Sequence, residues 1–149
     1  DGFAYTERTR EELERCELLP FQDAVANRAP FIMVGHISCP AVIGDNTPAS
    51  LSPAIMTGLL RQDMGYEGLI ITDALNMGAI VNLYSSSQAA VKAFLAGTDI
   101  LLMPADFRGA YAGMLAAVRD GTISRERLDA SVGRILRTKL RYLSPGEIK

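Results

Sequence analysis

The sequence predicts a parallel α/β fold, because short apolar runs alternate with helical patterns along 149 residues. Three runs are the predicted strands: residues 31–36, 69–72 and 99–103. Each run is nearly all apolar, which is typical of strands buried on both faces of a parallel sheet. The length is that of one domain, and no low-complexity segment or convincing linker divides it.

The segment before the first strand carries helix signals. Thr9 and Glu12 have the spacing of a capping box, which predicts a helix that runs through Arg15. Pro20 lacks a backbone N–H, so we expect it to kink or restart that helix. The connection after the first strand, residues 37–51, is long. Loops of that length at the carboxyl end of a strand are usually functional or mobile.

The remaining helices are also marked by caps and glycines. Ser52 as cap and Pro53 at the first position predict a helix that runs through Arg61 and stops at Gly65. Three further helices are expected over residues 86–96, 106–121 and 124–142. The basic residues of the last helix are interpreted as a solvated face: Arg125, Arg127, Arg134, Arg137, Lys139 and Arg141.

Composition excludes several classes of function. The formal net charge is -2, which argues against a protein that binds nucleic acid or an anionic membrane surface. We expect no membrane span and no signal peptide, because the apolar runs are short and residues 1–3 open no charged-then-apolar segment. Cys16 and Cys39 suggest no disulfide framework, so a cytoplasmic location is favoured.

The position of an acidic residue along its predicted strand indicates whether it is a candidate for chemistry or for a structural role. Asp73 ends the second predicted strand, and the carboxyl ends of parallel strands are where ligands and chemistry lie. Its carboxylate is therefore a candidate reacting group, with a cap for the turn at residues 74–76 as the alternative. Asp99 begins the third predicted strand, so we expect it at the opposite rim as a structural cap or loop anchor.

Two other residues are candidates for ligand contact. His36, the only histidine, ends the first predicted strand; it could donate to a ligand or be a buried residue bonded to backbone. Met77 follows Asp73 on the same loop and could touch a ligand or fill a gap. No metal site or cofactor is expected, because one histidine and two scattered cysteines do not form a ligand set.

Several short motifs with a specific combined spacing follow one another along the chain. They are PF at 20–21, MVGH at 33–36, PASLS at 48–52, LR at 60–61, GYEG at 65–68, ITDALNMGA at 71–79 and AGTDIL at 96–101. Together they resemble glycoside hydrolase family 3, and within it the bacterial β-N-acetylglucosaminidase branch, from about residue 10 to residue 143.

The resemblance implies a fold and a mechanism. The family's catalytic domain is a (β/α)8 barrel, so residues 1–149 would be its C-terminal portion: about the last three β/α units and a closing helix, with the N-terminal portion absent. Asp73 would be the nucleophile of a retaining mechanism on β-linked N-acetylglucosamine. His36 and Met77 would line the sugar pocket. The acid/base histidine belongs to an Asp-Ser-His motif expected immediately before Asp1.

Three hypotheses therefore stand. The first is part of a retaining β-N-acetylhexosaminidase whose partners are its carbohydrate substrate and either the missing part of the barrel or a second copy. Alone, this portion would have little activity. The second is a receiver-like module, which would need an acidic pair and a lysine at neighbouring strand ends for Mg²⁺ chemistry. The third is a non-catalytic α/β interaction module.

Overall fold

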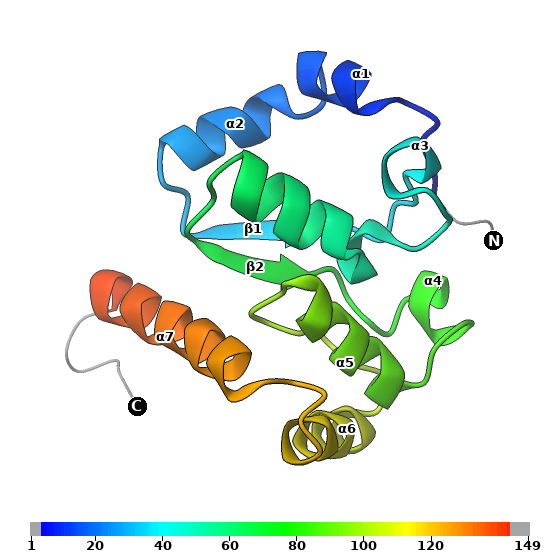
Figure 1. The fold of residues 1–149 in the computed structure, drawn as a ribbon, viewed down its shortest axis with the longest axis vertical. Helices are drawn as coiled ribbons and strands as arrows, with labels where there is room; N and C mark the ends of the chain where they lie inside the picture. The colour runs from blue at the N-terminus through cyan, green and yellow to red at the C-terminus, as the bar shows by residue number, and fades with distance from the viewer. Residues whose placement is uncertain (1–3, 144–149) are drawn as a thin grey trace.

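The computed structural model describes residues 4–143 as a mixed α/β fold, with helices around a small parallel sheet (Figure 1). The predicted α/β class is confirmed. The label η1 marks a 3-10 helix. The label η2 marks a π-helix, in which the carbonyl of residue i accepts from the N–H of residue i+5. The elements are α1 (Arg10–Arg15), α2 (Leu19–Ala26), β1 (Phe31–Val34), α3 (Pro40–Ile43), η1 (Ala49–Leu51), η2 (Ala54–Asp63), β2 (Leu69–Thr72), α4 (Gly78–Val81), α5 (Ser86–Ala96), α6 (Phe107–Arg119) and α7 (Arg125–Tyr142).

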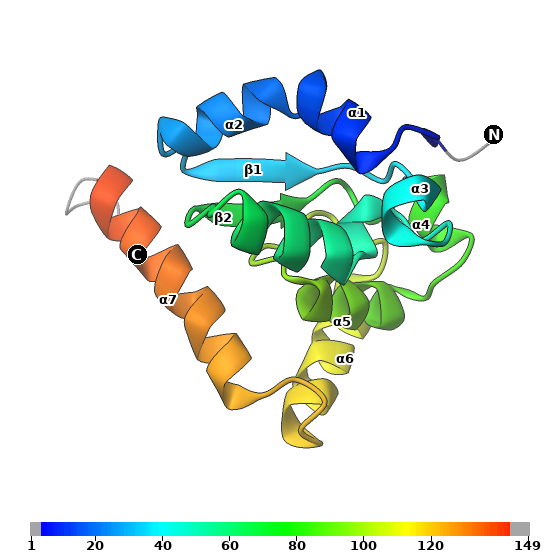
Figure 2. The ribbon, with the colours of Figure 1, turned by 45° about the horizontal axis from the view of Figure 1, so that its top comes forward.

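The two strands lie parallel and in register, from the Phe31–Leu69 pair to the Val34–Thr72 pair. Parallel neighbours need a crossover of a dozen or more residues. Here α3, η1 and η2 form that crossover. Figure 2 shows α1 and α2 beside β1 and α5 beyond β2. This arrangement brings the carboxyl ends of both strands to one rim.

The largest apolar cluster lies between the sheet and η2. Ile32 and Val34 from β1 and Ile70 from β2 pack against Met56 and Leu60 from η2. All five side chains are almost fully buried, so their removal from water stabilises the arrangement of sheet and helix. The strand ends are therefore rigid supports for the loops that follow them.

Each strand was predicted to be buried on both faces, and this prediction is wrong for β1. Phe31 and Met33 are both 50% exposed, whereas Ile32 and Val34 are buried. The apolar composition of β1 therefore produces one covered face and one open apolar face. In β2, by contrast, Leu69 and its neighbours are covered on both faces.

The third predicted strand, residues 99–103, is also wrong as a strand, because it forms only a bridge between Ile71 and Ile100. The N–H of Ile100 donates to Ile70, and the N–H of Thr72 donates to Ile100. The N–H of Leu102, which would form the next bond of the ladder, donates to the Thr72 hydroxyl at 3.0 Å. A side chain thus takes the place of a main-chain acceptor, and the ladder stops there.

Most predicted helix starts are confirmed. Thr9 and Glu12 form both bonds of the capping box. Pro20 lies in the first turn of α2, so the helix restarts there. Asp106 caps α6 through the N–H of Gly109, and Ser124 caps α7 through the N–H of Arg127. Local capping chemistry therefore located these ends correctly.

The predicted cap of η2 is wrong. Ser52 is buried and its hydroxyl has no hydrogen-bond partner among the described residues, while Pro53 occupies the cap position. The predicted stop is close: η2 ends at Asp63, and Gly65 adopts a left-handed conformation with φ of 66°. The predicted helix at residues 86–96 matches α5, which packs along α6.

Three short elements were not predicted: α3, η1 and α4. Two of them lie within residues 37–51, so the long connection after β1 is partly ordered. Within residues 4–143, no helix combines the length and the apolar character that crossing a membrane would require.

Candidate active site at the carboxyl ends of the strands

Asp73 directly follows β2 and is held at the rim by its own main chain. Its N–H donates to the carbonyl of Val34 at 3.0 Å, which ties it to the end of β1. Its carboxylate Oδ1 accepts the N–H of Ala74 at 2.7 Å. The side chain is partly exposed. One carboxylate oxygen is thus oriented by the protein, and the other is without a protein donor among the described contacts.

The alternative role of Asp73, a cap for the turn at residues 74–76, also stands, because its carboxylate accepts the N–H of Ala74, the first residue of that turn. Met77 is the N-cap residue of α4, and Asp73 bonds only the next N–H along the chain. The turn between them is fixed by Leu75, which is buried and whose N–H donates to the carbonyl of Leu102 at 2.9 Å. Asp73 therefore lies on a turn whose geometry is set by main-chain bonds to the end of β1 and to Leu102.

His36 lies two residues beyond β1 and is 5% exposed. Its Nε2 is 2.9 Å from the carbonyl oxygen of Ala74, and its Nδ1 is 2.6 Å from the hydroxyl of Ser50. A carbonyl oxygen can only accept, so Nε2 carries the proton and a neutral ring accepts the Ser50 O–H at Nδ1. The structure thus joins His36 to the turn after Asp73. Its predicted contact with a sugar stays a prediction.

Met77 is 45% exposed on the same loop, three residues past Ala74. Its N–H donates to the Ala74 carbonyl at 3.1 Å, so the loop closes as a tight turn. The thioether is free to meet a ligand that approaches the rim. The predicted ligand contact of Met77 also stays a prediction.

Residues 4–6 reach this rim from the start of the described chain. Tyr5 forms a parallel bridge with Ser38. The N–H of Thr6 donates to the Ser38 carbonyl, and the N–H of Ser38 donates to the Ala4 carbonyl, both at 2.9 Å. This pairing was not predicted, because a single bridge leaves no periodic pattern in the sequence. It places the chain just after residue 3 beyond the carboxyl end of β1.

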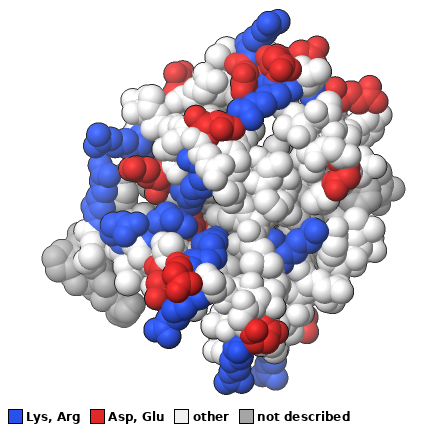
Figure 3. Space-filling view, viewed as in Figure 1, with Lys and Arg blue, Asp and Glu red and all other residues white. Residues whose placement is uncertain are grey.

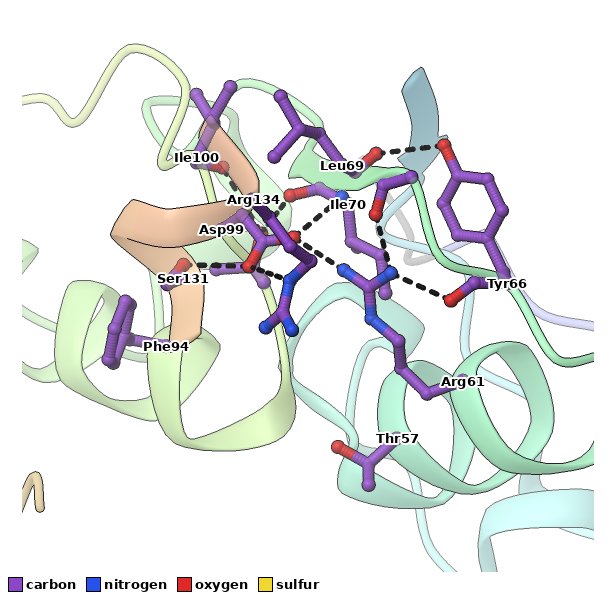
Figure 4. A network of polar contacts seen from close by, with 12 residues as sticks. Thr57, Arg61, Tyr66, Leu69, Ile70, Phe94, Asp99, Ile100, Ser131 and Arg134 are labelled. Carbon is purple, nitrogen blue, oxygen red and sulfur yellow. Dashed lines mark hydrogen bonds and ion pairs between the residues drawn. The ribbon is translucent and has the colours of Figure 1, made fainter. Parts of the chain in front are cut away.

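Asp99 lies at the other end of the sheet, where the prediction placed it as an anchor (Figure 4). Its side chain has no exposed surface. Its carboxylate accepts from the N–H of Ile70 at 3.0 Å, from Ser131 Oγ at 2.7 Å and from Arg134 Nε at 3.0 Å, and it also accepts from Arg61. This carboxylate therefore joins β2, η2 and α7 and has a structural role.

The expectation of a solvated basic face on the last helix is wrong for two residues. Arg127 and Arg134 are largely buried and turn toward Asp99. Arg127 also donates to the Phe94 carbonyl at 3.0 Å and lies over the Phe94 ring. Burial lowers the pKa of Arg127 and of Arg61, and the Asp99 carboxylate offsets part of that effect. Below, the Asp99 cluster means Asp99, Arg61, Arg127, Ser131 and Arg134.

A cleft of about 820 Å³ opens on the Asp99 side of the molecule and contains none of Asp73, His36 and Met77. Lys and Arg side chains gather near α7 in Figure 3. Two of the cleft's arginines are engaged by Asp99. Its charged lining residues are Arg28, Arg61, Glu67, Arg134, Arg137 and Arg141. In the described part of the chain, no three His, Cys, Asp or Glu side chains are grouped to hold a metal ion.

Known proteins with similar sequences are named as the kinds of enzyme that the motifs resemble. The chain is 34% identical to "Beta-hexosaminidase A" of Pseudoalteromonas piscicida over 93% of this chain and 27% of that protein. It is 32% identical to "Beta-N-acetylglucosaminidase/beta-glucosidase" of Cellulomonas fimi over 80% of this chain and 23% of that protein. The chain thus spans about a quarter of these relatives.

Solved structures share the fold. A glycoside hydrolase family 3 β-N-acetylglucosaminidase from Paenibacillus sp. str. FPU-7 superposes with a TM-score of 0.89 and 41% identity, over 92% of this chain and 27% of that one. Residues 1–138 match the family model described as "Glycosyl hydrolase family 3 N terminal domain". The match covers most of the chain, which therefore belongs to glycoside hydrolase family 3.

Proposed function

We propose that this chain supplies the nucleophile of a retaining glycoside hydrolase that removes β-linked N-acetylglucosamine, and that Asp73 is that nucleophile. The observation that carries the proposal is the placement of Asp73. Its carboxylate lies on a fixed turn at the end of a core strand, with one oxygen bonded to Ala74 and the side chain partly exposed. Membership of the family and the names of its relatives support the substrate class.

The proposed reaction has two steps. In the first, the free carboxylate oxygen of Asp73 attacks the anomeric carbon while the bond to the leaving-group oxygen breaks, and that oxygen takes a proton from the acid. In the second, water attacks the glycosyl ester, gives its proton to the same group and releases Asp73. The hydrogen bond from Ala74 keeps the carboxylate oriented in both steps, because its donor is main chain.

The start of the described chain reaches the same rim, where the acid/base group is needed. The family resemblance puts the Asp-Ser-His motif immediately before Asp1. Residues 4–6 are paired with Ser38 beyond the end of β1, so the chain enters beside the strand ends that hold Asp73. A loop that leaves from this point can approach a sugar from the side opposite the nucleophile. The backbone pairing thus supports the two-sided geometry that this chemistry needs.

We further propose that the chain forms the C-terminal portion of a (β/α)8 barrel, about its last three β/α units with α7 as the closing helix. Three observations support this. The strands are parallel and joined by helical crossovers. Phe31 and Met33 leave one apolar face of β1 open, as a barrel interior would require. The relatives are about four times longer. Alone, the chain should be nearly inactive and should associate with the rest of the barrel or with itself.

The test is Asp73→Asn in the full-length enzyme. Asparagine keeps the size of the side chain but cannot form the glycosyl ester, so turnover of a chromogenic N-acetylglucosaminide should fall on the order of 10⁴-fold, as when one member of a covalent catalytic unit is removed. The melting temperature should stay near that of the wild type. Asp120→Asn is the matched control, since Asp120 is an exposed turn residue whose carboxylate also accepts a nearby N–H. Wild-type turnover in Asp73→Asn would contradict the proposal.

A further inference from the structure

We infer that His36 is a positioning residue that orients the Asp73 carboxylate through the backbone of Ala74 and does not itself bind the sugar. The inference rests on the proposed function of Asp73. The first observation is burial: His36 is 5% exposed, and both of its ring nitrogens already have protein partners. No ring N–H therefore remains to donate to a sugar hydroxyl.

Three consecutive residues of the turn are tied to two segments of the fold, the end of β1 and residues 99–103. The N–H of Asp73 bonds Val34 at the end of β1, and the N–H of Leu75 bonds Leu102. Between them, the carbonyl of Ala74 accepts from His36 at 2.9 Å. The outer two ties are main chain to main chain. The middle tie is supplied by a side chain, so its strength depends on residue type.

Ala74 transmits the effect of His36 to the carboxylate. Its carbonyl is held by His36, and its N–H is the donor that orients Asp73 Oδ1 at 2.7 Å. The Ala74 carbonyl also accepts the N–H of Met77, so without His36 it keeps only a bond inside its own turn. The turn can then shift relative to β1, and the Ala74 N–H shifts with it away from the carboxylate. Small misplacements of a nucleophile are costly, because the reacting atoms must lie within a narrow range of distance and angle.

Ser50 fixes the ring that makes this contact. Ser50 has no exposed surface, and its N–H donates to the carbonyl of Gly35 at 3.2 Å. Its hydroxyl lies 2.6 Å from Nδ1 of His36 and can donate there, which is compatible with the Nε2 proton that the Ala74 carbonyl requires. The ordered part of the long connection after β1 thus holds the ring in the orientation that contacts the turn.

The test compares two amide replacements in the full-length enzyme. In His36→Gln the amide nitrogen lies near the position of Nε2 and can still donate to Ala74. In His36→Asn it lies near Nδ1 and cannot reach. We expect kcat with a chromogenic N-acetylglucosaminide to fall roughly 10²-fold in the Asn variant and to recover most of that loss in the Gln variant. The Kd of N-acetylglucosamine, measured by calorimetry, should be unchanged in both.

Thr57→Val is the control for a general loss of stability. Thr57 also donates to a distant main-chain carbonyl, that of Ala96 at 2.8 Å, but on η2. The Thr57→Val variant should have a lower melting temperature than the wild type but the same kcat. If the Asn variant does not fold, Ser50→Ala is the second test and should lower kcat several-fold with sugar affinity kept.

Two results would overturn the inference. One is wild-type kcat in His36→Asn, or in Ser50→Ala where the Asn variant does not fold. The other is an equal loss of sugar affinity in the Asn and Gln variants, which would mean direct contact. An inactive wild-type enzyme would instead contradict the proposed function. In that case the inference is tested by a crystal structure of His36→Asn, or of Ser50→Ala where the Asn variant does not fold. Displacement of the Ala74 carbonyl and the Asp73 carboxylate would support the inference. Unchanged positions of both groups would contradict it.

Discussion

Replacing Asp99 with asparagine should strongly destabilise the enzyme, because this carboxylate is the only acidic group in the Asp99 cluster, against three arginines. The side chain is wholly buried and accepts from Ile70, Ser131, Arg134 and Arg61. Asparagine preserves the volume but removes the charge. Removing one partner of a buried ion pair costs about 3–5 kcal/mol, since the other partner stays buried without compensation.

The assay is thermal unfolding of the full-length enzyme. At ~2–4 °C per kcal/mol for a domain of 150–250 residues, the loss corresponds to a melting temperature lower by about 6–20 °C. Asp129→Asn is the control, because Asp129 pairs with Arg125 on the exposed face of α7 at 3.4 Å. Such an exposed pair contributes only about 0.3–0.5 kcal/mol. Equal melting temperatures for the two variants would refute the structural role of Asp99.

Two further predictions concern the loop before β2. Burial raises the pKa of Tyr66 to about 12, so the unfolded chain loses its phenol proton first, and stability should fall as the pH rises from about 10 to about 12. Tyr66→Phe should remove that fall, as measured by urea unfolding at several pH values; an identical pH profile in the variant would contradict it. Gly68→Ala should lower the melting temperature, because a Cβ there would lie 2.7 Å from the Ala29 carbonyl oxygen and against the Tyr66 hydroxyl. An unchanged melting temperature would show that this loop can shift to accept the methyl group.

The parts of the fold that local chemistry determines were predictable. Capping residues such as Thr9, Asp106 and Ser124 act within one helical turn, so their pattern is visible in the sequence. The failure at residues 99–103 has a nonlocal cause. Whether an apolar run forms a ladder depends on its neighbour, and here the Thr72 hydroxyl takes an N–H that a carbonyl would otherwise accept.

In the candidate site, too, local features were predictable from the sequence and contacts between distant residues were not. Asp73 could be singled out because a polar residue that ends an apolar run marks the carboxyl end of a strand. Its bonding to Val34 and the contact of His36 with Ala74 join residues far apart in the sequence, which no local pattern reveals.

The Asp99 cluster was partly visible. Arg127, Ser131 and Arg134 follow the i, i+4, i+7 spacing of one helix face, which indicates a shared partner. The sequence could not name Asp99 as that partner. Arg127 and Arg134 were therefore predicted to be exposed like the other basic residues of the last helix, although both are partly buried against Asp99.

The central claim is that Asp73 forms a covalent bond to the sugar, and trapping that intermediate tests it most directly. A fluorinated N-acetylglucosamine derivative that slows the second step would be incubated with the full-length enzyme, which would then be digested and analysed by mass spectrometry. The account predicts one added sugar per enzyme, on the peptide that contains Asp73, and none in Asp73→Asn. A sugar attached to another residue, or turnover without any covalent adduct, would contradict it.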